Sequence, residues 1–183
     1  MNEIIKTLLS RRSVRAYKNT QISDEKLQMI LEAGRFAPSA MNLQPWHFLV
    51  IQNKAALDEF SKDVKDVMIA SDFENAKKEG FNFFYNAPTV IFICGEETSS
   101  FAEMDCTMAA SNMITAATLL GLQSCFIVSF KVLFKTPYHE KYAVKFGLPK
   151  GYMPMCAVVL GHAADGETLK IPHKKTEIVT LIK

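Results

Sequence analysis

Three arginines and a serine lie within five residues near the start of the chain, in the segment Arg11-Arg12-Ser13-Val14-Arg15. Guanidinium groups bind phosphates and other planar oxyanions through paired hydrogen bonds. In an extended segment, Arg11, Ser13 and Arg15 would project from one side and Arg12 from the other. That side could bind a phosphate and a second negative group, although a solvated basic turn would have the same composition.

A second set of hydrogen-bonding side chains lies in a loop bracketed by two prolines, between Ala37 and Trp46. Ser39, Asn42 and Gln44 can each donate and accept hydrogen bonds, which suits a heteroaromatic ring whose edge alternates N–H and C=O groups. The alternative is a turn in which serine and asparagine bond to the local backbone.

A basic tetrapeptide, Pro172-His173-Lys174-Lys175, lies near the C-terminus. Such a run is usually a solvated tail. Together with the first basic segment, it could instead complete a phosphate site.

Alternating helical and strand patterns would position these three segments. Helices are expected over Ile4–Leu9, after the N-cap Ser23, after the cap Asn53, over Met104–Leu120 and over His139–Phe146, with weak helical character from Asp66 to Tyr85. Strands are expected at His47–Ile51, Thr89–Cys94, Cys125–Val128, Met155–Leu160 and Ile178–Ile182. This order predicts a sheet covered by helices, and the nearly all-round apolar helix Met104–Leu120 indicates burial or a subunit interface.

The composition is that of one globular domain spanning residues 1–183. Lys plus Arg number 21 and Asp plus Glu 19, so the net charge of +2 gives no reason to expect a nucleic acid or an anionic membrane as partner. The longest apolar runs are too short to cross a bilayer, and the first residues do not have the pattern of a signal peptide.

The four cysteines are Cys94, Cys106, Cys125 and Cys156, and no two have C-x-x-C spacing. We therefore expect no metal site and no disulfide framework, and we expect the reducing cytoplasm as the compartment. The G-x-G-x-x-G and G-x-S-x-G motifs are absent, which argues against a dedicated dinucleotide domain and against a serine hydrolase.

Taken in order, the segments resemble the FMN-dependent nitroreductase family. The resemblance rests on RRSVRAYK, APSAMNLQPWHFLV, FNFFYNAPTVIFIC, DCTMAASNMITAATLLGLQSCFIVSF and PHKKTEIV. It extends from about Ile4 to the C-terminus and leaves only Asp66–Gly80 without a counterpart. It implies an α+β fold, a three-layer α/β/α sandwich with a mixed, mainly antiparallel sheet. It also implies an intertwined homodimer with an FMN site at each of two positions along the interface.

The same resemblance implies roles for the basic segment and the tail. Arg11 and Ser13 would bind the phosphate and ribityl chain of FMN, with Arg12 in the same anchor. Arg15 would lie near N1 and O2 of the ring, where a cation stabilises the reduced flavin. Lys175 resembles the family's C-terminal phosphate-binding cation. His173 stands where the family often has Lys or Arg.

Two further sets of residues are implied to contact the cofactor. Pro38, Ser39 and Asn42, with Gln44 just beyond them, resemble a loop that the partner subunit contributes. The backbone of Ile127–Ser129, which includes Val128, resembles the strand end that meets the N5 and O4 edge.

The activity implied is a ping-pong transfer of hydride or electrons from NAD(P)H through flavin N5 to a small electron-poor acceptor, a nitroaromatic or a quinone. No side chain need act as a dedicated acid or base, so no catalytic residue is named. The alternatives are reductive dehalogenation, ene reduction or flavin fragmentation on the same fold, or a non-catalytic FMN-binding module. The aromatic residues of Phe81–Tyr85 would either line the substrate pocket or pack in the core.

Overall fold

The computed structural model describes residues 2–166, 174–175 and 178–182. Its sheet has four strands in the order β1-β2-β4-β3, and each neighbouring pair is antiparallel. The strands are β1 (Trp46–Ile51), β2 (Thr89–Glu96), β3 (Gln123–Ile127) and β4 (Tyr152–Gly161). The apolar runs of β2 and β4 occupy the centre, where both faces of a strand are buried.

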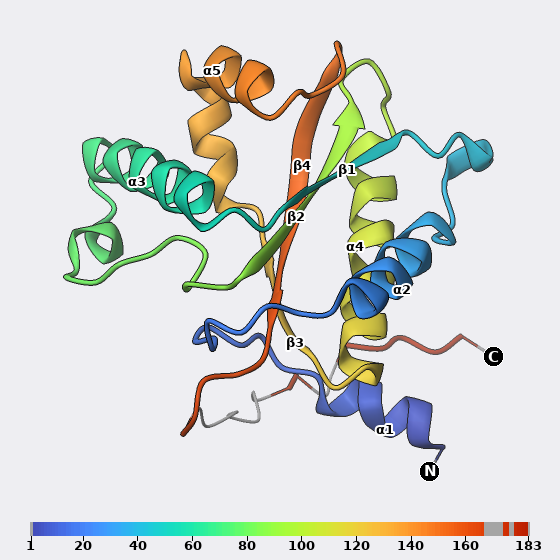
Figure 1. Ribbon diagram of the computed structural model, residues 1–183. Helices are drawn as coiled ribbons and strands as arrows, with labels where there is room; N and C mark the ends of the chain where they lie inside the picture. Colours follow the sequence, from blue (N-terminus) through green and yellow to red (C-terminus); the bar gives the residue numbers. More distant parts are fainter. Residues whose placement is uncertain (1, 167–173, 176–177, 183) are drawn as a thin grey trace.

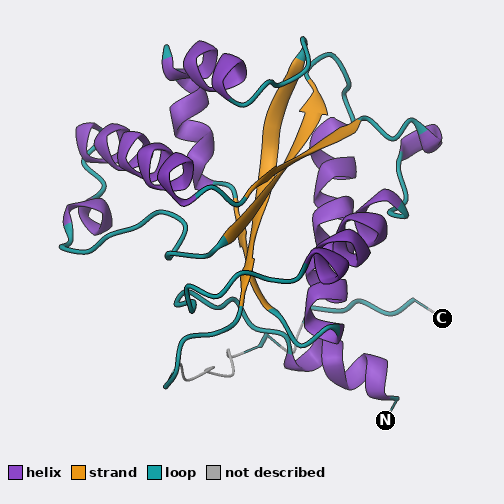
Figure 2. Ribbon diagram, in the orientation of Figure 1, coloured by secondary structure: helices purple, strands orange, loops and turns teal. Residues whose placement is uncertain are grey.

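Helices cover both faces of this sheet (Figures 1 and 2). On one face, α2 (Asp24–Arg35) and α4 (Ala102–Leu119) pack on Ile91, Ile93 and Val158. On the other face lie α3 (Lys54–Ala70), the 3-10 helix η3 (Ser129–Lys135) and α5 (Tyr138–Lys145). The α+β class and the three layers are therefore confirmed. Among the described residues, the expected parallel pairing is limited to a single bridge between Ser13 and Ser124.

Helix ends follow the capping residues of the sequence. Ser23 Oγ accepts a hydrogen bond from the Lys26 N–H at 3.4 Å, and Asn53 Oδ1 accepts one from the Ala56 N–H at 3.0 Å. After α4, Gly121 adopts a left-handed φ of +74°, which allows the chain to reverse into β3. The first helix, α1 (Glu3–Ser10), also lies where the apolar spacing predicts it.

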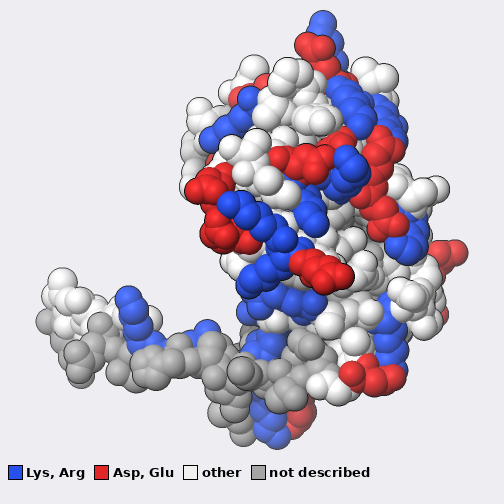
Figure 3. Space-filling model, turned by 90° about the vertical axis from the view of Figure 1, so that its left-hand side faces the viewer, with Lys and Arg blue, Asp and Glu red and all other residues white. Residues whose placement is uncertain are grey.

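One expectation about elements was confirmed only in part, and another was wrong. The weak helical character expected from Asp66 to Tyr85 is limited to the end of α3, which continues to Ala70, and to the short 3-10 helix η2 (Glu74–Lys77). Ile178–Ile182 is not a strand: its apolar side chains are 70–91% exposed and the segment extends away from the body of the chain (Figure 3). Its β-branched residues suit a strand, but a strand forms only where a second strand can bond to it.

Ion pairs and one buried hydrogen bond join α3 to α5, on the face where acidic and basic side chains are interspersed (Figure 3). Glu59 pairs with Lys141 and Lys145. Asp63, only 7% exposed, accepts hydrogen bonds from Tyr142 Oη at 2.7 Å and Lys141 Nζ at 2.6 Å. These contacts fix α5 against α3.

All four cysteine thiols are free and buried. Burial raises the pKa of both Cys94 and Cys106 to about 12. Within the part of the chain that the structure describes, no helix has both the length and the apolar character needed to cross a membrane.

Candidate cofactor-binding site

The basic segment runs along the outer edge of β3. Ser13 bridges to Ser124, and the Val14 N–H donates to the Ser124 carbonyl at 3.1 Å. Val14 is fully buried, and its carbonyl accepts a hydrogen bond from Tyr17 Oη at 2.8 Å. The segment is therefore extended and fixed at every second residue, so alternate side chains leave it on opposite sides.

The guanidinium of Arg12 binds the end of α1. Its Nη1 donates to the carbonyls of Leu9 at 2.8 Å and Arg11 at 2.7 Å, two of the acceptors left free at the last turn of α1. In one copy of the chain, Arg12 thus stabilises the helix that precedes the basic segment. Its contact with a cofactor stays a prediction.

Arg11 and Ser13 line a shared cavity of about 320 Å³ between α1, β3 and α4, which we name the α4 cavity. Its polar wall also includes Thr107, Ser111 and Thr115. One guanidinium and several hydroxyl groups therefore face the same space, which suits a ligand that carries an anion and hydroxyl groups.

Arg15 lines a different cavity of about 280 Å³, which we name the Arg15 cavity. Its guanidinium carbon lies 6.0 Å from the centre of the Tyr85 ring, within the range of a cation–π contact. Partial burial opposes the charge of Arg15, but Cys125, Tyr85 and Tyr17 together raise its pKa. The charge is thereby kept and its position restricted.

Cys125 on β3 is the common neighbour of these basic residues. Burial raises the pKa of its thiol, while the charges of Arg15 and Arg11 and a hydrogen bond with Ser13 act in the opposite direction. Arg11, Ser13 and Arg15 consequently all lie near Cys125, although Arg15 lines a different cavity from the other two.

The amide loop between α2 and β1 holds its own shape through side-chain hydrogen bonds. Ser39 Oγ accepts from the Gln44 N–H at 3.1 Å, and Gln44 Nε2 donates to Asn42 Oδ1 at 3.0 Å. Asn42, Gln44 and Met41 have left-handed φ angles of 56°, 48° and 52°. The loop includes the 3-10 helix η1 (Ala40–Asn42), and its side chains from Met41 to Gln44 are exposed.

Within one copy, the amide loop does not meet the basic segment. Figure 1 shows the loop projecting beyond the end of α2, far from α1 and β3. Of the cavities formed by described residues, neither the α4 cavity nor the Arg15 cavity is lined by Ser39, Asn42 or Gln44. Pro38, in the same loop, is exposed. A site that uses both segments needs a second copy of the chain.

The strand end and the tail complete the set of predicted residues. Ile127 is buried, with 5% exposure, whereas Val128 and Ser129 directly after it are exposed. The backbone after β3 is thus open to a ligand while the Ile127 side chain belongs to the core. Lys175 is exposed, and His173 lies outside the described residues.

The polar side of α4 was not predicted. Thr107, Ser111 and Thr115 recur every four residues, a spacing that places their side chains along one side of the helix and that could have revealed them. Of the aromatic residues considered for the substrate pocket, Phe83 and Phe84 pack in the core, while Phe81 and Tyr85 line the Arg15 cavity.

Comparisons with known proteins bear on this arrangement. The model of the nitroreductase family matches residues 8–162. A protein of Archaeoglobus fulgidus, named as a candidate NADH dehydrogenase/NAD(P)H nitroreductase, is 31% identical over 176 residues, covering 90% of this chain and 88% of that protein. The crystal structure of a nitroreductase with bound FMN from Bacteroides fragilis superposes with a TM-score of 0.93, at 35% identity over 100% of both chains. A nitroreductase with bound FMN from Desulfitobacterium hafniense gives 0.91 at 32% identity, again over 100% of both chains.

Proposed function

Because the chain belongs to the nitroreductase family, we propose that it is an FMN-dependent oxidoreductase that passes hydride or electrons from NAD(P)H to a small electron-poor acceptor, such as a nitroaromatic compound or a quinone. The observation that carries this proposal is the match over the full chain to structures that bind FMN. We also propose that residues 1–183 form a single FMN-binding domain.

The residues around β3 fit the phosphate and ribityl parts of FMN. A phosphate needs a cation and hydrogen-bond donors, and Arg11 and Ser13 supply both at the α4 cavity. The hydroxyl of Ser111, from the facing helix, suits the ribityl hydroxyl groups. With the ring extending past the strand end, Val128 and Ser129 would offer exposed backbone groups to its edge.

FMN, when bound, supplies the hydride- and electron-carrying chemistry. The chain supplies binding and electrostatics. Arg15 provides a positive charge whose position is restricted by the Tyr85 ring, which favours a ligand edge that becomes negative. The roles proposed here for the side chains are binding, orientation and charge stabilisation.

We propose a homodimer, in which the amide loop of one copy completes the site of the other. Three exposed features support this arrangement. Among the described residues, Ser39, Asn42 and Gln44 of the loop line neither the α4 cavity nor the Arg15 cavity. On α4, Met104 and Met108 are 60% and 44% exposed, and the apolar side chains of the arm Ile178–Ile182 are 70–91% exposed among the described residues. A second copy would bury all three.

The function is tested with protein reconstituted with FMN. We expect a stable yellow complex whose flavin absorbance bleaches on adding NADH or NADPH without oxygen, and steady-state NAD(P)H oxidation by a simple quinone or nitroarene. A protein that binds no FMN would contradict the proposal. FMN binding without turnover would instead favour the non-catalytic module, and a panel of halogenated, enone and nitro acceptors separates the remaining activities.

The compartment proposed is the cytoplasm. The four free, buried thiols support this proposal, because a reducing compartment keeps cysteines unpaired. The test is to isolate the protein without added thiols and to measure the oxidation state of its four cysteines by thiol titration of the unfolded chain.

A further inference from the structure

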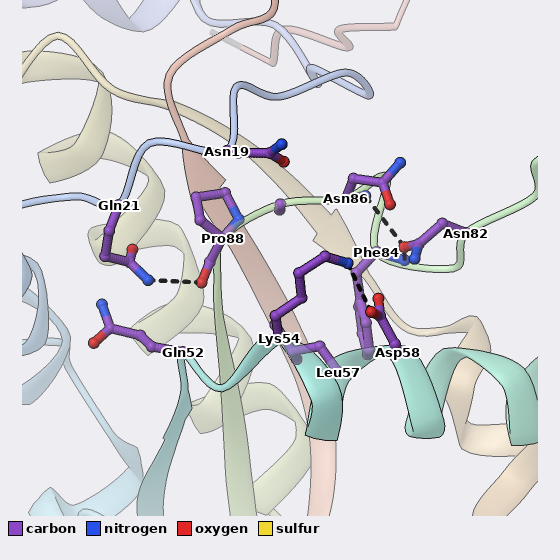
Figure 4. A pocket seen from close by; sticks show the side chains of 11 residues that line it. Asn19, Gln21, Gln52, Lys54, Leu57, Asp58, Asn82, Phe84, Asn86 and Pro88 are labelled. Carbon is purple, nitrogen blue, oxygen red and sulfur yellow. Dashed lines mark hydrogen bonds and ion pairs between the residues drawn. The ribbon is translucent and has the colours of Figure 1, made fainter.

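A cavity of about 240 Å³ lies beside the turn from Asn82 to Pro88 (Figure 4). It is formed by three stretches that are distant in sequence: residues 19–21, residues 52–58 and the turn before β2. Five of the side chains that line it carry amides: Asn19, Gln21, Gln52, Asn82 and Asn86. We name it the amide cavity. None of the proposed contacts to FMN lies in it.

Two of the amides are fixed by a buried hydroxyl group. Gln52 Nε2 donates to Thr89 Oγ1 at 3.1 Å, and Thr89 Oγ1 donates to Gln21 Oε1. Gln21 Nε2 in turn donates to the carbonyl of Pro88 at 2.9 Å. Thr89 is fully buried, so this series of hydrogen bonds orients Gln52 and leaves the Oε1 atom of Gln52 available as an acceptor.

The other amides keep unused hydrogen-bonding capacity. Asn82 Oδ1 accepts from the backbone N–H groups of Phe84 and Asn86, at 2.9 and 3.1 Å, which leaves its Nδ2 as a donor. The side chains of Asn19 and Asn86 have no hydrogen-bond partner within residues 2–166, 174–175 and 178–182, and Figure 4 shows both beside the cavity. Donors and acceptors are thus offered from several sides.

The remaining walls are neutral or apolar. Lys54 Nζ and Asp58 Oδ2 pair at 2.6 Å, so the two charges at the cavity compensate each other. Leu57 and Phe84, 5% and 1% exposed, supply apolar surface. A ligand that matches this lining is uncharged, has an apolar face and carries adjacent donors and acceptors on its edge.

Nucleobases have this combination, and asparagine or glutamine amides pair with the adjacent N6 donor and N7 acceptor of adenine. The cavity volume is below the usual 300–1,000 Å³ of pockets for larger ligands, so it suits a ring rather than a whole dinucleotide. Asn82 and Asn86 line both this cavity and the Arg15 cavity, so the two spaces adjoin.

From this lining we infer that the amide cavity binds an adenine-type nucleobase. Resting on the proposed function, we further assign that base to the adenosine half of the NAD(P)H donor, whose other half reaches the flavin. The ring would lie against Phe84 and Leu57, with Asn19 and Gln52 bonding its edge. Because the base itself is recognised by neutral groups, its binding should be nearly independent of salt.

The first experiment titrates adenosine into the FMN-reconstituted protein by calorimetry, with ribose as the probe that lacks the base. We expect adenosine to bind and ribose not to bind. Asn19→Ala and Gln52→Leu should each raise the dissociation constant of adenosine about threefold to tenfold, the effect of one neutral hydrogen bond. Asn75→Ala, which removes an exposed amide outside the cavity, is the matched control and should change nothing.

The second experiment compares NADH with reduced nicotinamide mononucleotide, which lacks adenine. Asn19→Ala should raise the KM for NADH and leave that for the mononucleotide unchanged. Loss of adenosine binding with an unchanged KM for NADH would assign the cavity to a free adenine nucleoside or nucleotide. The inference is overturned if the wild-type chain does not bind adenosine. It is also overturned if Asn19→Ala and Gln52→Leu both bind adenosine as tightly as the wild type does. Adenosine titration requires no turnover, so it remains decisive even if neither donor reduces the flavin.

Discussion

The carboxylate of Asp105 accepts a hydrogen bond from the backbone N–H of Ala40 at 3.1 Å, joining α4 to the amide loop across 65 residues of sequence. Asp105 is 5% exposed, and its second oxygen, Oδ2, has no hydrogen-bond partner in the described chain. A buried carboxylate oxygen without a donor is costly. A donor from a second copy would remove that cost, which agrees with the proposed dimer.

Asp105→Ala should weaken FMN binding about tenfold, because the loop that carries Ser39 and Asn42 loses its link to α4. Asp105→Asn retains an acceptor for Ala40 and should bind FMN more tightly than the alanine variant. Fluorescence titration of FMN measures both. Asn112→Ala is the control, since Asn112 Nδ2 bonds the Ala33 carbonyl of α2 and not the loop. Equal FMN affinity of wild type and Asp105→Ala would contradict this role.

Arg15→Ala should lower the affinity for FMN and also its midpoint potential, because the reduced form loses a compensating cation. Arg15→Lys keeps the charge but not the planar contact with Tyr85. Its FMN affinity and midpoint potential should therefore lie between those of the wild type and those of Arg15→Ala. Tyr85→Phe keeps the ring but loses the hydroxyl group that acts on Arg15, so its potential should lie closer to that of wild type than to that of Arg15→Ala. Spectroscopic redox titration reads the potential. An unchanged potential in Arg15→Ala would show that the guanidinium lies away from the ring.

Mixing two disabled variants tests whether the site is shared between copies. Arg15→Ala and Asn42→Ala homodimers should each have little activity. Mixed dimers would contain one site with both native residues and one with neither, so about half of the fully native activity per dimer should return. Native mass spectrometry verifies the mixed species. If verified mixed dimers stay inactive, both residues act within the same copy.

Acid should loosen the contact of α3 with α5. Hydrogen bonds from Lys145 and Lys141 lower the pKa of Glu59 to about 2. A carboxyl with a lowered folded pKa stabilises the fold above its unfolded value, near 4.5, and loses that contribution as the pH falls towards 2. Glu59→Gln should therefore lose stability at neutral pH and show a flatter decline in Tm between pH 4.5 and 2. Glu25→Gln, at an exposed carboxylate with no ion pair to the described residues, should keep the wild-type slope.

Two glycines that pack closely should respond differently to alanine. A Cβ at Gly95 would lie 2.9 Å from Ala102 Cβ, which the backbone holds in place, and 3.0 Å from the buried Cys106 Sγ. Gly95→Ala should cost about 1–3 kcal/mol of unfolding free energy, the usual effect of overpacking. At Gly34, the nearest atom is the flexible Met113 Cε, and alanine also favours the helix by about 1 kcal/mol. Denaturant unfolding should show the smaller loss for Gly34→Ala, and the reverse order would contradict this reasoning.

The elements were predictable wherever local chemistry decides them. Ser23 and Asn53 cap their helices through hydrogen bonds to residues three positions on, and Gly121 ends α4 in a conformation that glycine favours. Likewise, the apolar runs of β2 and β4 are typical of central strands, which are buried on both faces.

What depends on tertiary contacts was not predictable. Nothing in the spacing of RRSVR shows that Arg12 turns back to the end of α1 while Arg11 and Arg15 enter two different cavities. Asp105 reads as an ordinary acidic residue in the first turn of a helix, and its bond to Ala40 exists only once α4 meets the loop. The arm Ile178–Ile182 has a strand's composition but pairs with no strand of the described residues.

In a single copy of the chain, the amide loop lies far from the basic edge of β3 (Figure 1). For this reason, FMN binding is expected to depend on the association of two copies. If each half-site is supplied by a different molecule, FMN binds the pair and not its parts, so ligand and self-assembly stabilise each other by mass action. Dilution would then release coenzyme, and excess coenzyme would hold the pair together at concentrations where the empty chains separate.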